Sequence, residues 1–192
     1  MNRPNAVHEP DPWRAPVIVA QIPDTGLHRE IEASPREREA VAEAAGLREV
    51  LSARASFDVT PKAGGRVHVI GRVQARIGQT CVVTLDPIES DLDEEIDLMF
   101  APEAEARQLA DLIAEGQDED DDEGDDSEVA DPPEAILNGV IDLGRLATDA
   151  LFLGIDPYPR KPGTVFEAHV EAPDPEDHPF ASLKALRDKP KG

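Results

Sequence analysis

The sequence predicts an α+β fold, in which an antiparallel β-meander or hairpin sheet packs with a few short helices and is interrupted by a disordered acidic insertion. Apolar and polar residues alternate over residues 51–60 and 66–77, as they do in half-buried strands. Residues 34–46 carry the start and stop signals of a helix. Residues 115–131 hold eleven acids and no base, which favours a solvated loop over a packed element.

The predicted domain organisation is simple. Residues 1–15 form a disordered lead, residues 16–186 form a single domain interrupted by the acidic loop 115–131, and residues 187–192 form a basic tail. Within the domain, residues 16–23 are predicted to be a short strand because a proline bounds the apolar run at each end.

The helix is predicted over residues 35–45. Ser34 is a favoured N-cap, Pro35 suits the first helical position, and Glu37 completes a capping box. Gly46 supplies the C-terminal stop.

The two alternating stretches predict a long antiparallel hairpin with its turn at residues 61–65. The inward positions run from Leu51 to Val59 and from Val67 to Ile77 at every second residue. The same spacing places Arg66, Arg72 and Arg76 on the outward face.

The rest of the fold is predicted from shorter patterns. Pro87 and an acidic bend are expected to separate two further strands, which gives a meander of about four strands over residues 48–100. The further elements are strands at 81–85, 95–100 and 139–142, and helices at 102–114, from Leu143 to Leu153, and at 180–186.

Composition excludes several classes of protein. One cysteine excludes an intramolecular disulfide framework, and no apolar run is long enough to span a bilayer. The first residues lack an apolar signal sequence, so a cytoplasmic location is expected. The net charge of −22, half of it in residues 115–131, opposes loose attachment to nucleic acid or to an anionic membrane.

The sequence offers no convincing catalytic, cofactor or metal site. An EF-hand with Gly124 at its sixth position would start at Glu119 and place Ala130 where a bidentate glutamate is needed. Cys81 has no second cysteine nearby, so a buried structural cysteine on a strand is the expected role. The acidic run is either a solvated loop or an arm that captures a basic partner.

One basic patch could contact RNA or another partner. Residues 59–85 contain no acid, and Lys62, Arg66, Arg72 and Arg76 are the candidate binding residues there. Their outward spacing, about 6.6 Å for every two residues of a strand, is comparable to phosphate separations along RNA. The alternative is a solvated strand face that prevents edge aggregation.

Several blocks of the chain resemble the bacterial YceD family of large-ribosomal-RNA-subunit accumulation proteins. They fall in the family's order across roughly residues 17–186 and lie at 71–75, 79–88, 93–98, 138–144, 151–159 and 179–183. The signature positions are Gly71, Cys81, Leu85, Pro87, Asp142 and Leu143. One departure concerns the C-x-R-C-L segment of many members, because Val83 and Thr84 replace its arginine and second cysteine. No metal or redox role of the cysteine pair carries over.

The resemblance implies a non-enzymatic factor for ribosome biogenesis that needs no cofactor and no small-molecule substrate. The leading hypothesis is a factor for accumulation of the large-subunit RNA that binds either ribosomal RNA or a basic large-subunit ribosomal protein. Two alternatives remain, a structural adaptor with an unrelated protein partner and an enzyme using scattered Asp, Glu and His. The oligomeric state stays open.

Overall fold

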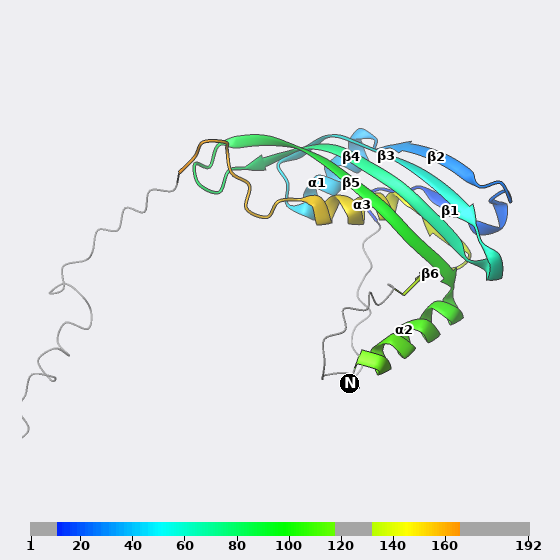
Figure 1. Ribbon diagram of the computed structural model, residues 1–192. Coiled ribbons are helices and arrows are strands. Elements are labelled where there is room, and N and C mark those ends of the chain that lie inside the picture. The colour runs from blue at the N-terminus through cyan, green and yellow to red at the C-terminus, as the bar shows by residue number, and fades with distance from the viewer. Residues whose placement is uncertain (1–10, 118–131, 166–192) are drawn as a thin grey trace, which may run out of the picture. The chain divides into compact units, whose positions relative to one another are not determined.

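Strands and helices are interspersed along the chain, and Figure 1 shows two of the helices lying under a curved sheet. The computed structural model describes residues 11–117 and 132–165, and the chain divides into two compact units, Met1–Lys161 and Pro162–Gly192. Every element described below belongs to the first unit. In chain order they are β1 (Pro16–Ile18), a 3₁₀ turn (Val19–Gln21), β2 (Leu27–Glu32), α1 (Pro35–Ala45), β3 (Glu49–Pro61), a 3₁₀ turn (Ala63–Gly65), β4 (Val67–Thr80), β5 (Pro87–Pro102), α2 (Glu103–Gln117), β6 (Glu134–Ile136), β7 (Val140–Asp142) and α3 (Leu143–Gly154).

The main sheet has five strands in the order β2-β3-β4-β5-β6. Strands β2 to β5 form an antiparallel meander, and β6 joins the end of β5 in parallel. A separate antiparallel pair, β1 and β7, joins the start of the described chain to the residues before α3. The predicted α+β fold with an antiparallel sheet is therefore confirmed.

The core lies on one face of this sheet, beneath α1 and α3 (Figure 1). Inward side chains of β3 and β4 alternate with outward ones and are almost completely buried, as the hydrophobic alternation predicts. The main contributors are Phe57 and Val59 of β3, Val69, Val73 and Ile77 of β4, Val41 of α1, and Leu143, Ala147 and Leu151 of α3.

Helix α1 begins and ends where its capping residues predict. Ser34 Oγ accepts a hydrogen bond from the Glu37 amide at 3.4 Å, and Glu37 Oε2 accepts one from the Ser34 amide at 2.8 Å. Gly46 ends the helix in the left-handed region with φ of 64°. The prediction of a helix at 35–45 is confirmed, because its signals are local.

The hairpin of β3 and β4 is also confirmed, with one correction at its start. The register shifts between Val50 and Ser52, so Leu51 lies in a bulge and Val50 takes the buried position. The Arg38 side chain donates a hydrogen bond to the carbonyl oxygen of Leu51, which satisfies a backbone group that the bulge removes from the ladder.

Two predictions between residues 81 and 100 are wrong. Residues 81–85 form a turn, closed by a hydrogen bond of 2.9 Å from the Leu85 amide to the Cys81 carbonyl, so Cys81 lies just after β4 and not on a strand. Instead of an acidic bend, β5 runs without interruption from Pro87 to Pro102. Pro87 is tolerated because it is the first residue of the strand.

Strands β2 and β6 and the burial of Trp13 were not predicted. Strand β2 pairs with β3 from Leu27 to Glu32, although four of its six side chains are polar or charged. Trp13, in the predicted disordered lead, is buried with 1% of its surface exposed. The predicted disordered lead, residues 1–15, is therefore too long, because Trp13 belongs to the core.

Of the remaining predicted elements, three are found in the structure and the others lie partly or wholly outside the described residues. Helix α2, strand β7 and helix α3 lie within one to three residues of their predicted bounds. The first three residues of the acidic segment 115–131 end α2, and its residues 118–131 lie outside the described residues. So do residues 1–10, the predicted helix at 180–186 and the tail at 187–192.

Among the helices that the structure describes, none is both long enough and apolar enough to cross a membrane.

Candidate interaction surface

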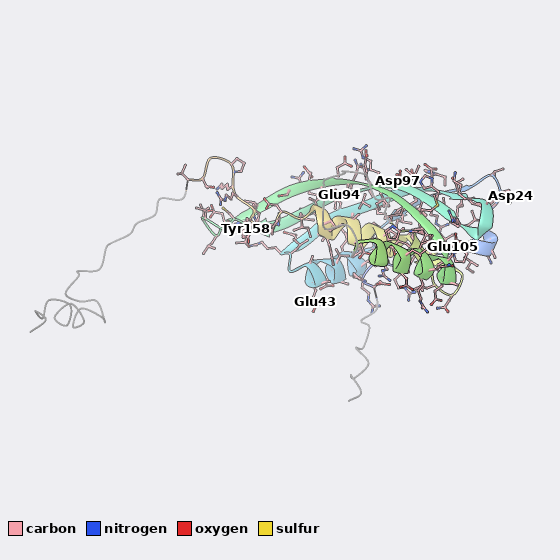
Figure 2. The ribbon with its side chains drawn as sticks, turned by 60° about the horizontal axis from the view of Figure 1, so that its bottom comes forward. Asp24, Glu43, Glu94, Asp97, Glu105 and Tyr158 are labelled. Carbon is pink, nitrogen blue, oxygen red and sulfur yellow. The ribbon has the colours of Figure 1, made fainter. Side chains whose placement is uncertain are left out.

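The outward face of β2 to β5, opposite α1 and α3, is covered by no element of the described chain, and we call it the open face. Figure 2 shows Asp97 of β5 on this side of the sheet and Glu43 of α1 on the other. The antiparallel register brings outward residues of neighbouring strands into direct opposition. The charge and hydrogen bonding of the open face therefore depend on which outward side chains lie opposite one another on neighbouring strands.

Arg72 of β4 is held by two acids of β5. It lies directly opposite Glu95, and its guanidinium makes a bidentate contact with Asp93, from Nε to Oδ1 at 2.5 Å and from Nη2 to Oδ2 at 2.8 Å. Glu95 Oε1 lies 3.8 Å from Nη1. The hydrogen bond from Arg72 is the main cause that lowers the pKa of Asp93.

Arg76 repeats the arrangement one step along the sheet. It lies opposite Asp91, whose Oδ1 is 3.4 Å from Nη1, and its Nε donates to Glu89 Oε2 at 2.8 Å. Each arginine of β4 thus contacts the acid opposite it and the acid two residues earlier on β5.

The other predicted cations of the patch lie at the far end of the hairpin. Arg66, just before β4, donates two hydrogen bonds to Glu105 Oε1 of α2. Lys62 is exposed in the turn between β3 and β4. The structure therefore does not gather Lys62, Arg66, Arg72 and Arg76 into one group, and it pairs all three arginines with acids.

A polar chain continues across the face to β3. Arg54 donates to Gln74 Oε1 from Nε at 3.1 Å and from Nη2 at 2.8 Å, and Gln74 Nε2 donates to Asp93 at 3.1 Å. Two histidines make similar cross-strand contacts, His28 with Asp58 at 2.8 Å and His68 with Asp97 at 2.6 Å. The hydrogen bond with Asp58 is the main cause that raises the pKa of His28.

Acids outnumber bases on the open face. The outward positions of β2 to β5 present three guanidiniums, those of Arg54, Arg72 and Arg76, against nine exposed carboxylates. These belong to Glu30, Glu32, Glu49, Asp58, Glu89, Asp91, Asp93, Glu95 and Asp97. The sequence predicted a basic surface here. The open face is instead acidic overall, and its three arginines are surrounded by carboxylates.

The open face is also hollowed. Two adjoining depressions of about 500 and 430 Å³ lie over β2 to β5, and both are lined by Glu32, Arg54 and Gln74. Their other polar lining includes Glu30, Arg72, Asp91 and Asp93. A partner on this face can therefore contact acids that line the depressions as well as acids on the surface around them.

A second region is built at the end of the sheet, where two of the family-like blocks meet. The Val82 amide donates to the Pro159 carbonyl at 2.9 Å, and Gln79 Nε2 donates to the Asp156 carbonyl at 2.9 Å. Lys161 Nζ lies 3.1 Å from Asp86 Oδ2. Tyr158, labelled in Figure 2, is largely exposed at this end.

Cys81 is completely buried at this junction. Its Sγ accepts a hydrogen bond from the Lys161 amide at 3.3 Å. The Thr84 hydroxyl is the largest of the influences that lower the pKa of the thiol to about 6, followed by the amides of Lys161, Thr84 and Val83. Thr84, at the position of the second cysteine in the family pattern, therefore supports the sulfur. Among residues 11–117 and 132–165, no three His, Cys, Asp or Glu side chains are placed to share a metal ion.

Gly71 and Leu143 of the signature serve packing. A Cβ on Gly71 would lie 2.5 Å from the Phe57 ring, so the ring occupies the space that a side chain would need. Leu143 is fully buried, and its amide donates to the Ala15 carbonyl at 3.1 Å.

Asp142 caps α3 and anchors the start of the described chain. Its Oδ1 accepts from the amides of Ala15, Gly144 and Arg145 at 2.7, 3.1 and 3.4 Å. Leu85 and Pro87 shape the connection between β4 and β5, Leu85 with a φ of 61° and Pro87 as the first residue of β5.

Comparison with known proteins agrees with these blocks. A family model described as large ribosomal RNA subunit accumulation protein YceD matches residues 69–187, more than half of the chain. The chain belongs to the YceD family. The match starts within β4, so β2 and β3 lie outside it. Neither a search of the curated proteins nor one of the solved structures found a match. The family description connects the chain with accumulation of the large ribosomal RNA subunit and names no enzymatic activity.

Sequence reasoning missed the acids of β5 as functional candidates. Glu89, Asp91, Asp93, Glu95 and Asp97 recur at every second residue, which is the signal of an outward strand face. The proline at 87 and the density of acids favoured a bend instead. A count of the period over residues 88–98 would have found the strand and its outward acids, but not which residues of β4 they face.

Proposed function

We propose that this YceD-family chain supports accumulation of the large-subunit ribosomal RNA by binding a basic ribosomal protein of that subunit. The observation that carries the proposal is the open face, where Arg72 and Arg76 are engaged by carboxylates and acids outnumber bases by nine to three. Such a surface attracts cations and repels the phosphates of RNA.

The net negative charge of the open face, and not the ion pairs of Arg72 and Arg76, favours a basic protein over RNA as the partner. Exposed ion pairs are weak, so a phosphate could displace Asp93 or Glu89 from an arginine. The displaced carboxylates would remain on the adjacent strand, however, which is about 4.8 Å away. That separation is shorter than the screening length of about 8 Å at physiological salt. A polyanion on this face therefore meets uncompensated repulsion.

The experiment compares the two classes of partner directly. The full chain is titrated with purified basic large-subunit proteins and, separately, with fragments of large-subunit RNA, over a range of salt concentrations. We expect binding to at least one basic protein that weakens as salt rises, and much weaker binding to the RNA fragments.

Two outcomes contradict the proposal. Tight RNA binding that is lost in Arg72→Glu/Arg76→Glu would favour the direct RNA contact predicted for Lys62, Arg66, Arg72 and Arg76. Binding to neither class would favour an adaptor with an unrelated protein partner.

A further inference from the structure

Strand β5 carries a row of carboxylates on the open face. Glu89, Asp91, Asp93, Glu95 and Asp97 occupy every second position and are all exposed, and we call them the β5 carboxylate column. Alternate side chains of a strand lie about 6.6–6.8 Å apart. A peptide in extended conformation presents alternate side chains at that same spacing, so its cations can match the column one to one.

In the isolated chain, the column is partly filled by cations of β4. Arg76 contacts Glu89 and Asp91, Arg72 contacts Asp93 and Glu95, and His68 contacts Asp97. Two guanidiniums cannot neutralise five carboxylates. The column therefore keeps a negative charge, while the arginines hold its side chains in a row.

The arrangement points to a specific mode of binding, which rests on the proposed function. We propose that the β5 carboxylate column and the adjoining depressions bind an extended segment of a basic protein, with Lys or Arg at alternate positions, and that Arg72 and Arg76 compete with it as internal counter-ions. A docking segment supplies the cations that the column lacks and takes over carboxylates that the two arginines hold.

This mode of binding predicts that removing two surface arginines raises the affinity for a basic segment. Removing Arg72 and Arg76 adds negative charge and releases four carboxylates, so binding of a basic segment becomes stronger. If the arginines were themselves the binding residues for a polyanion, the same change would weaken binding. One variant therefore separates a protein segment from RNA as the ligand.

The probes are two peptides of equal composition, one with lysine and threonine alternating and one with the lysines consecutive. In extended conformation, the alternating peptide directs all its lysines to one side, whereas the consecutive one directs half of them away. We expect the full chain to bind the alternating peptide several-fold more tightly, as measured by fluorescence anisotropy.

Variants then assign this preference to the column. Since each exposed charge pair changes affinity by roughly two- to fivefold, Asp91→Asn/Asp93→Asn should weaken binding of the alternating peptide by about tenfold. Arg72→Gln/Arg76→Gln should strengthen it by roughly five- to tenfold.

The matched control is Glu39→Gln/Glu43→Gln, which removes two exposed acids of α1 on the helix side of the sheet. It should change affinity by less than about twofold. The acidic run at 115–131 is present in every variant and cancels from the comparison. Urea unfolding of each variant excludes loss of folding as the cause.

Equal affinity for the two peptides, equal effects of the column and control variants, or weaker binding by Arg72→Gln/Arg76→Gln would each overturn the inference. If the chain still bound a basic large-subunit protein in those cases, the proposed function would stand and only this surface would be wrong. If that protein did not bind either, the proposed function would fall with it.

Discussion

The two faces of the main sheet differ in burial and in charge. On the covered face, β3 and β4 bury Phe57, Val69 and Ile77 in the core beneath α1 and α3. On the open face, the same strands expose Arg54, which donates to Gln74, and Arg72, whose ion pair with Asp93 exchanges easily with solvent. Stability and the proposed binding can therefore be changed separately, because successive side chains of a strand belong to opposite faces.

The largest loss of stability is expected from Gly71→Val on the covered face. The new Cβ would lie 2.5 Å from the Phe57 ring and 3.0 Å from the Ser56 carbonyl, so the ring and the strand must shift. Overpacking of this kind costs about 2–3 kcal/mol. Urea unfolding measures it, with Ile70→Ala on the open face as the control. A change equal to the control's would show that the ring moves without cost.

A smaller loss is expected from Asp142→Ala beneath the covered face. This change removes the N-cap of α3 and the acceptor for the Ala15 amide, at a cost of about 1–2 kcal/mol. Asp149→Ala, which removes only an exposed contact with Arg145, is the matched control. Equal unfolding midpoints for the two variants would contradict the capping role.

A pH-dependent loss is expected from Cys81→Ala at the end of the sheet. The pKa of the thiol is lowered from 9.0 to about 6 in the folded chain, so the thiolate stabilises the fold fully above pH 9 and loses this effect as the pH falls through 6. The difference in unfolding free energy between wild type and variant should therefore grow from pH 6 to pH 9. A constant difference over this interval would show that the sulfur stays protonated.

The smallest effect on stability is expected from Arg72→Gln/Arg76→Gln on the open face. Both side chains are half exposed, and exposed ion pairs contribute little to folding. The urea midpoint should stay within experimental error of the wild type, while peptide binding increases. A large fall in the midpoint would mean that the open face also holds the fold together.

Part of the fold could be predicted because its signals lie close together in the sequence. Helix α1 is set by its cap at Ser34 and its stop at Gly46, which lie next to it in the sequence. The alternation around Phe57 and Val69 likewise involves only neighbouring residues. The errors arose where distant groups decide the conformation. The Leu85 turn depends on the amide of Val82 meeting Pro159, and the burial of Trp13 depends on the segment around Asp142.

By itself, the sequence determined the α+β class, the hairpin and the outward direction of Arg72 and Arg76. Only the tertiary structure decided what those arginines face. Periodicity sets the side of a strand on which a residue lies, whereas register sets its neighbour on the next strand. The pairing of β4 with β5 placed the acids from Glu89 to Asp97 beside the arginines and turned an expected basic patch into an acidic surface.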